Sequence, residues 1–405
     1  MTVREEAASA VVAGHICLDV IPAIEAGGER ARNRFAPGSL VEIASTVIST
    51  GGAVSNTGLA LHRLAIPTRL VGKVGDDLFG RAILQILGEY GPSLAGGIAT
   101  DPSVSSSYTL VISPPGVDRF FLHYPGANAT FVAADVPFDD LAGAGLFHFG
   151  YPPAMRGMYV NDGEETVKMF REAAQRGMIT SLDMCMPDVE SEAGGMDWRR
   201  VLRRVLPHVD LFLPNLQEIG FMLGGRGRRA GGCGVELCSE LADELLAMGA
   251  AVVGLKLGEE GMYLRTTADS DRLSGLTSVT GPTFLSWVGR EIHSTRFEVE
   301  AAGTTGCGDA AVAGLIAGLL RGLTIEKALT MAVAVGACCA EAADAISGLR
   351  PWGEMRQRID AGWNRRPAPV DWPGWTHDAS AGLSRGPNDA QRRQTGADGH
   401  GRIER

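Results

Sequence analysis

Residues 163–185 read GEETVKMFREAAQRGMITSLDMC, in which a helical pattern of apolar residues leads directly into a short apolar strand pattern. Short apolar runs alternate with helical segments along much of the chain. The other apolar runs are SAVVAGHICL (9–18), TRLVGKVG (68–75), GLFHFGY (145–151), VDLFLPN (209–215) and AAVVGLKLG (250–258), and the other helical segments include GRAILQILGEYG (80–91) and VELCSELADELLAMG (235–249). This alternation predicts an α/β fold, with a mostly parallel sheet between helices on both faces.

Two segments interrupt this alternation. Residues 36–50 and 105–124 are rich in β-branched residues and contain the turn signals Pro37-Gly38 and Pro114-Pro115-Gly116. They are typical of antiparallel strands outside the main sheet. We therefore expect a small β-sheet lid over a site, formed within residues 20–50 and 105–126.

The overall composition favours a small-molecule partner. The chain has 405 residues, 45% hydrophobic and 21% charged, and a formal net charge of -10. An acidic protein is a poor ligand for nucleic acid or an anionic membrane, which require excess Lys and Arg. No apolar run approaches the length of a membrane helix, and the 7 cysteines show no paired zinc-site spacing. We expect a soluble cytoplasmic protein.

The end of the chain differs in composition from the rest. Residues 376–405 carry few apolar residues that could pack into a core. We expect one folded domain over residues 9–363 and a disordered tail over 364–405.

The segment AAGTTGCGDAAVAGLIAGLLRG (301–322) joins a glycine-threonine loop to an apolar helix, with Asp309 at the junction. One interpretation makes Asp309 a simple helix cap. A dinucleotide fingerprint fits Gly306, Gly308 and Ala311, but an alanine-rich helix follows where a second strand is required, and no Lys-Ser or Lys-Thr completes a Walker loop. In the third interpretation the loop binds a phosphoryl group and Asp309 is a general base.

The third interpretation requires partners elsewhere. Asp19 follows an apolar run, and Gly51-Gly52 precede Asn56 at a predicted helix start. Carboxylates and amides are suited to bind neighbouring hydroxyl groups. Taken alone, Asn56 is more typical of a helix cap than of a ligand-binding residue.

Together, the ordered motifs resemble those of the ribokinase-like, or PfkB, family of carbohydrate kinases. The motifs are GGAVSN (51–56), LVGKVGDDLFG (70–80), YPGANATF (124–131), PNLQE (214–218), KLGEEG (256–261) and GTTGCGD (303–309). The resemblance implies a three-layer α/β/α fold with a lid, and transfer of the γ-phosphoryl group of ATP to a hydroxyl of a small carbohydrate.

The resemblance also implies roles for individual residues. Asp309 matches the catalytic base, and the anion-hole positions are Gly306, Cys307 and Gly308. The sugar-binding positions are Asp19, Gly51, Gly52 and Asn56. The nucleotide-binding positions are Asn215, Glu218, Lys256, Gly258 and Gly261, and Glu218 matches a residue that organises Mg²⁺ through water.

Each of these roles has a structural alternative. Asn215 to Glu218 could simply begin a helix, with the amide as its cap. Lys256 to Gly261 could be a hairpin turn in which the two glycines adopt positive φ.

The chain departs from the family pattern at Gly303, where relatives carry an aspartate, and at Cys307, where they carry alanine. The aspartate helps to hold a monovalent cation in ribokinase-like relatives, so its absence argues against K⁺ activation. Gly150 stands where ribokinase has an acidic sugar contact, which disfavours ribose. Fructose, 2-keto-3-deoxygluconate and related sugars remain open as acceptors. A nucleoside kinase or a catalytically weak sugar- or nucleotide-binding protein are the alternatives, and a homodimer could form through the lid.

Overall fold

The computed structural model of the protein describes residues 7–24, 38, 40–113, 120–224, 234–367 and 372–391. Within these residues, an 11-stranded sheet forms the centre of the molecule. Its strands, in sheet order, are β14 (Thr376–Asp378), β15 (Leu383–Arg385), β13 (Glu291–Ser294), β12 (Met262–Thr266), β11 (Val252–Lys256), β10 (Leu211–Phe212), β9 (Ile179–Asp183), β8 (Leu146–Gly150), β1 (Ala10–Gly14), β4 (Thr68–Gly75) and β5 (Ile98–Asp101). From β11 to β5 the strands are parallel, and from β12 to β14 they are antiparallel. The predicted α/β class is confirmed.

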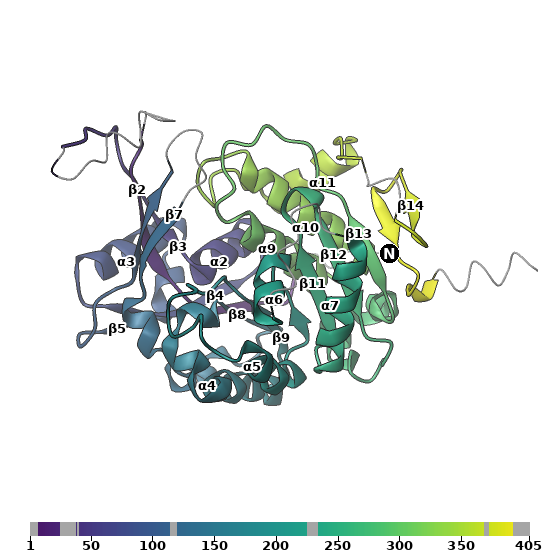
Figure 1. Ribbon diagram of the computed structural model, residues 1–405, viewed down its shortest axis with the longest axis horizontal. Helices are drawn as coiled ribbons and strands as arrows, with labels where there is room; N and C mark the ends of the chain where they lie inside the picture. Colours follow the sequence, from purple (N-terminus) through teal and green to yellow (C-terminus); the bar gives the residue numbers. More distant parts are fainter. Residues whose placement is uncertain are drawn as a thin grey trace, which may run out of the picture.

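Helices cover both faces of this sheet (Figure 1). One face packs against α2 (Ala53–Arg63), α3 (Leu78–Tyr90), α8 (Thr277–Thr280), α9 (Cys307–Leu320), α10 (Ile325–Ala340) and α11 (Trp352–Asp360). The other packs against α4 (Arg156–Gln175), α5 (Trp198–Val205), α6 (Leu216–Met222) and α7 (Val235–Ala247). Successive residues of β1 show why: Val12 belongs to the first hydrophobic cluster, and Val11 and Ala13 belong to the second. A strand with apolar residues on both faces needs a helical layer on each side.

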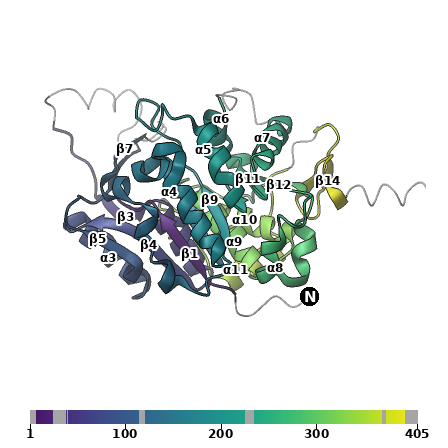
Figure 2. The same cartoon turned by 90° about the horizontal axis from the view of Figure 1, so that it is seen from below.

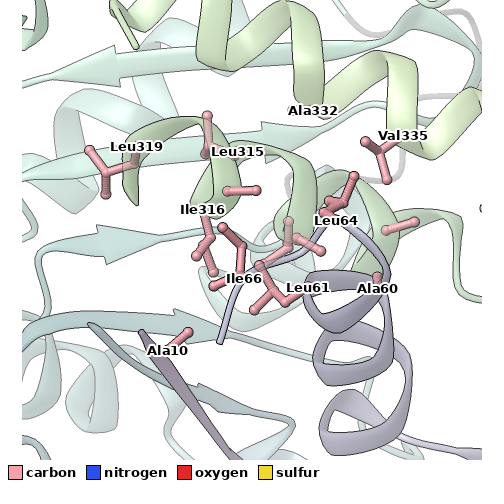
Figure 3. Close-up of a cluster of buried hydrophobic side chains, with 14 of the residues drawn as sticks. Ala10, Ala60, Leu61, Leu64, Ile66, Leu315, Ile316, Leu319, Ala332 and Val335 are labelled. Carbon is pink, nitrogen blue, oxygen red and sulfur yellow. The ribbon is translucent and has the colours of Figure 1, made fainter. Parts of the chain in front are cut away.

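Helix α9 lies deep in the first layer, between α2 and α10. Leu315 and Ile316 of α9 share a buried cluster with Leu61 of α2 (Figure 3). A Cβ on Gly314 would lie 2.8 Å from the Met331 carbonyl oxygen of α10, so glycine permits this close approach. Close packing explains the Ala- and Gly-rich composition of α9 and anchors Asp309 on a rigid helix.

Within the described residues, a second sheet of 4 strands is separate from the main sheet. It is called the lid sheet below. It contains β3 (Val47–Gly51), β2 (Cys17–Ile21), β6 (Tyr108–Ile112) and β7 (Phe120–Tyr124), in that order. The predicted hairpin over 105–124 forms as β6 and β7. The structure differs from two of the expected strand positions. Residues 40–46 contain no strand, while residues 36, 37 and 39 lie outside the described part. The first apolar run divides into β1 and β2, and β2 joins the lid and pairs in parallel with β6.

The register of the lid sheet separates its polar and apolar residues. Ser49, Asp19, Thr109 and His123 form one cross-strand row, and Ile48, Val20, Leu110 and Leu122 form the next. Side chains alternate between faces along a strand, so the two rows face opposite ways. His123 of the polar row contacts His15, which follows β1. The polar row therefore faces the main domain, and the apolar row faces away from it.

The prediction of a disordered tail is wrong for residues 372–391. Strands β14 and β15 extend the main sheet beyond β13, at the end opposite the lid (Figures 1 and 2). Asp389, fully buried, forms an ion pair with Arg290 at 2.9 Å. An edge strand has unpaired backbone groups, and Arg290 is a buried charge that needs a partner. The pairing of β15 with β13 and the ion pair of Asp389 with Arg290 thus help to hold a segment whose average composition is polar. Residues 392–405 lie outside the described part, and among the described helices none could span a membrane.

Candidate active site

Asp309 lies in the first turn of α9 with 3% of its surface exposed, and side chains from three other positions donate hydrogen bonds to it. Asn56 Nδ2 donates to Oδ2 at 3.0 Å. Thr57 Oγ1 and Tyr151 OH donate to Oδ1 at 3.3 and 2.7 Å. A residue that only capped α9 would need none of these partners, because capping uses backbone N–H groups.

Asn56 and Asp309 are separated by more than half of the chain, yet they are in direct contact. The Oδ1 atom of Asn56 is buried and accepts no hydrogen bond in the structure. A buried polar atom without a partner is costly unless a ligand satisfies it. Asn56 and Asp309 therefore present neighbouring acceptors to one ligand.

Asp19 lies in β2 of the lid sheet with 9% of its surface exposed. The thiol of Cys17 donates to its Oδ1 at 3.2 Å, and Thr109 lies opposite it on β6. Burial raises the pKa of Asp19 to about 6, and the hydrogen bonds from Cys17 and Thr109 counteract that rise. A Cβ on Gly51 would lie 2.2 Å from Asp19 Oδ2, so a glycine is required for this arrangement.

His15 and His123 connect the main domain to the lid. Their Nε2 atoms lie 3.2 Å apart, and His123 Nδ1 lies 3.0 Å from Thr109 Oγ1. Burial, followed by the proximity of His123, lowers the pKa of His15, and burial lowers the pKa of His123. Both rings are therefore neutral at neutral pH. Gly52, at φ 86°, packs against His15, where a Cβ would lie 2.4 Å from Nδ1.

On the other side of Asp309, Lys256 forms a buried ion pair with Asp183. Lys256 Nζ lies 2.6 Å from both carboxylate oxygens, and the side chains are 11% and 0% exposed. Burial acts to lower the pKa of Lys256, but the charges of Asp183, Glu218 and Asp309 outweigh it and the pKa rises. A Cβ on Gly308 would lie 3.6 Å from Nζ, so the ammonium group is next to the predicted anion hole.

The segment from Asn215 to Glu218 forms a helix cap, as the structural alternative predicted. Asn215 Oδ1 accepts from the Glu218 backbone N–H at 2.7 Å, and Glu218 Oε2 accepts from the Asn215 N–H at 2.7 Å. Burial raises the pKa of Glu218 to about 8, with Lys256 opposing the rise. Within the described ranges, no group of three or more His, Cys, Asp or Glu side chains could hold a metal ion. A Mg²⁺ ion held by one carboxylate, phosphate oxygens and water fits this arrangement, and an all-protein cage does not.

Residues Lys256 to Gly261 form a hairpin turn between β11 and β12. Gly258 and Gly261 have φ values of 58° and 97°, as the turn interpretation predicted. A Cβ on Gly261 would lie 2.0 Å from the Ser294 carbonyl oxygen. The hairpin starts beside Asn215, which forms a bridge with Lys256. The predicted nucleotide-binding positions therefore adjoin one another at the same edge of the sheet.

The loop before α9 contains the predicted anion-hole positions. Gly306 has φ 73° and precedes the helix. The backbone N–H of Cys307, one of the predicted anion-hole donors, donates to the Thr304 carbonyl at 3.4 Å. A Cβ on Gly303 would lie 2.8 Å from the Ala342 carbonyl oxygen, so glycine at this position has a packing reason.

The residues of the site that were not selected from the sequence include Tyr151, Asp183, His15 and Thr57. Asp183 ends β9 and Tyr151 immediately follows β8. The carboxyl ends of parallel strands are the usual ligand-binding edge, and this rule could have selected both. For His15 the sequence offered no signal beyond its place after β1.

Comparisons with known proteins agree on one family. A model described as pfkB family carbohydrate kinase matches residues 7–352. The 2-dehydro-3-deoxygluconokinase of Bacillus subtilis (strain 168) is 27% identical over 316 residues, covering 77% of this chain and 87% of the relative. Fructokinase-1 of Zea mays is 24% identical over 334 residues, covering 80% and 92%. The structure of Arabidopsis thaliana ribokinase complexed with ribose and ATP superposes with a TM-score of 0.64 at 19% identity, covering 87% and 98%.

Proposed function

The chain belongs to the pfkB family of carbohydrate kinases, and we propose that it transfers the γ-phosphoryl group of ATP to a hydroxyl of a small sugar. The enzyme is thus a phosphotransferase with an alcohol acceptor, and fructose and 2-keto-3-deoxygluconate are the first acceptors to test. The observation that carries the proposal is the direct contact between Asn56 and Asp309. It joins a hydroxyl-binding group to a general base beside the Lys256 ammonium group.

Each side of the site has a separate task in this proposal. Asp19 and Asn56 bind the sugar hydroxyls beneath the lid, and Gly51 and Gly52 leave room for Asp19 and His15. Asp309 Oδ2 accepts the proton of the attacking hydroxyl, because Asn56 is its only donor in the part of the chain that the structure describes. Mg·ATP, when bound, supplies the phosphoryl group.

The phosphate side is formed by the predicted nucleotide positions. Glu218 would hold Mg²⁺ through water, Asn215, Lys256, Gly258 and Gly261 would bind the phosphates of ATP, and Gly306, Cys307 and Gly308 would stabilise the charge of the transferring group. No monovalent cation is included in the mechanism, since Gly303 has no carboxylate and packs against carbonyl oxygens. We assign the kinase domain to residues 9–363, with the strands of residues 372–391 as an addition to its sheet.

The function is tested by measuring ADP release with Mg·ATP across a panel of ketoses, sugar acids and nucleosides. Activity with a sugar supports the proposal. A preference for nucleosides would assign the chain to nucleoside kinases instead. Thermal stabilisation by a sugar or nucleotide without ADP from any acceptor would indicate a binding protein.

Acceptor use should depend on pH through Asp19. Its pKa of about 6 means that Asp19 is ionised above pH 6 and protonated below it. The groups that face it are Cys17 and Thr109, with the neutral pair His123 and His15 beyond them. A protonated Asp19 accepts fewer hydrogen bonds from the sugar. We therefore expect kcat/KM for the acceptor to fall about tenfold per pH unit below pH 6.

The matched variant is Asp19→Asn, which should lower kcat/KM at every pH and abolish the decline near pH 6. The measurement is kcat/KM for the acceptor from pH 5 to 8. A decline at the same pH in Asp19→Asn would assign it to another group.

We also propose a homodimer formed through the outer face of the lid sheet. Ile48, Val20, Leu110 and Leu122 form a continuous apolar row across the strands, and Ile48 and Leu122 are 56% and 54% exposed. An exposed apolar sheet face with free edges favours association with a second copy.

Leu122→Asp should convert the dimer to a monomer in size-exclusion chromatography with light scattering. Leu285→Asp is the control, because Leu285 is 73% exposed and lies far from the lid in sequence and structure. A monomeric wild-type protein, or a dimer that survives Leu122→Asp, would contradict the proposed interface.

A further inference from the structure

Tyr151 has an unusual backbone conformation next to Asp309. It directly follows β8 and lies in the left-handed region, at φ 71° and ψ 44°. This conformation is unfavourable for a non-glycine residue and persists where the surrounding structure holds it. Here the Tyr151 N–H donates to the Asp183 carbonyl at 3.1 Å, and Pro152 and Pro153 follow. The chain thus holds Tyr151 in place although glycine would be the easier choice.

The strained backbone directs the Tyr151 ring into the site. Its hydroxyl donates to Asp309 Oδ1 at 2.7 Å, the shortest of the hydrogen bonds to that carboxylate. The ring centroid lies 6.1 Å from that of His15. Burial, followed by the charges of Asp309 and Asp183, raises the pKa of the phenol well above its usual value. Tyr151 therefore remains a hydrogen-bond donor to Asp309.

The hydrogen bonds divide unequally between the two carboxylate oxygens. A carboxylate oxygen accepts about two hydrogen bonds. Oδ1 accepts from Thr57 and Tyr151, so its capacity is filled, while among the described residues Oδ2 accepts from Asn56 alone. One acceptor position remains, and it lies on the oxygen beside Asn56.

From this division we propose that Tyr151 is a positioning residue for phosphoryl transfer: with Thr57 it occupies Oδ1 of Asp309 and so directs Oδ2 toward the acceptor hydroxyl. The inference rests on the proposed role of Asp309 as the base. Tyr151 acts through Asp309 and does not itself receive the proton. Its effect is therefore on the chemical step and not on substrate binding.

The test is Tyr151→Phe, which removes only the hydroxyl. We expect kcat to fall about 10- to 100-fold, as for other small misplacements of a reacting group, with KM for ATP and for the acceptor within about twofold of wild type. Tyr263→Phe is the matched control. Tyr263 lies in β12 and its OH donates to the buried carboxylate of Glu291 at 2.9 Å, so this variant also removes a hydroxyl that is bonded to a buried carboxylate. Tyr263→Phe should leave kcat unchanged.

Thr57→Val provides a second variant at the same oxygen and should give the same selective loss of kcat, whether or not Tyr151→Phe folds well. Unchanged kcat in Tyr151→Phe would overturn the inference, as would a change confined to the acceptor KM, which would make Tyr151 a wall of the sugar pocket. An increased kcat would show that Tyr151 blocks the base. The failures are distinguishable: no ADP from any acceptor with the wild-type protein refutes the proposed function, an active Asp309→Asn refutes the role of Asp309 as base, and an inactive Asp309→Asn with a normal Tyr151→Phe refutes only this inference.

Discussion

Asp309→Asn is expected to lower kcat by about 10²- to 10⁴-fold, the usual contribution of a general base. Asparagine keeps the shape of the side chain, and its single oxygen can still accept from Thr57 and Tyr151, while its NH2 group replaces the oxygen that accepts from Asn56. What it loses is the capacity to take a proton. Binding of ATP and of the acceptor, measured by calorimetry or by ligand-dependent thermal shift, should therefore change little.

A matched control separates catalysis from helix stabilisation. Glu354 also lies in the first turn of a helix, α11, but is exposed. An acid there interacts favourably with the positive end of the helix. If Asp309 were only a helix-terminal acid, Asp309→Asn and Glu354→Gln would behave alike. Near-normal turnover in Asp309→Asn would refute its assignment as the base.

Lys256→Met should cause a large loss of both activity and stability. The substitution retains most of the side-chain volume but removes a buried cation that lies 2.6 Å from Asp183. Removal of one partner of a buried ion pair costs about 3–5 kcal/mol, because the other charge is left without compensation. We expect a lower midpoint of denaturant unfolding and a fall in kcat of at least about 100-fold, since a cation next to transferring phosphate charge contributes several kcal/mol.

A double variant distinguishes the structural role of Lys256 from the catalytic one. Combining Lys256→Met with Asp183→Asn removes both charges, so most of the lost stability should be recovered. The midpoint of denaturant unfolding should therefore return toward the wild-type value. Activity should remain low if the ammonium group acts on the phosphoryl group. Recovery of activity together with stability would show that Lys256 serves only to neutralise Asp183.

The sequence selected Asp19, Gly51, Gly52 and Asn56 on the sugar side of Asp309, but not Tyr151, Thr57 or His15. Asp19 was selected because it follows an apolar run, Gly51, Gly52 and Asn56 because they stand in a glycine-rich motif, and all four match sugar-binding positions of the family that the chain resembles. Tyr151 and Asp183 stand in strand-end segments whose sequence is ordinary. Their importance follows from the sheet order, which places β8 and β9 next to each other beneath α9.

For the C-terminal segment, the prediction from sequence failed for a different reason. Its polar composition predicted disorder, and composition is an average over many residues. Residues 372–391 are held by contacts with distant parts of the chain, including the pairing of β15 with β13 and the ion pair of Asp389 with Arg290. Arg290 is about 100 positions away in the chain, so no local pattern could indicate it.

The sequence by itself determined the α/β class, the presence of a lid and the kinase family, and it nominated Asp309 as the base, because periodicity and motif spacing are local properties of the chain. Only the tertiary structure decided which groups touch Asp309, and how its two oxygens are used. Asn56 and Thr57 reach that carboxylate from α2, and Tyr151 reaches it from the end of β8. Their convergence depends on strand order and on the close packing of α9 against α2, which are set by contacts between distant parts of the chain.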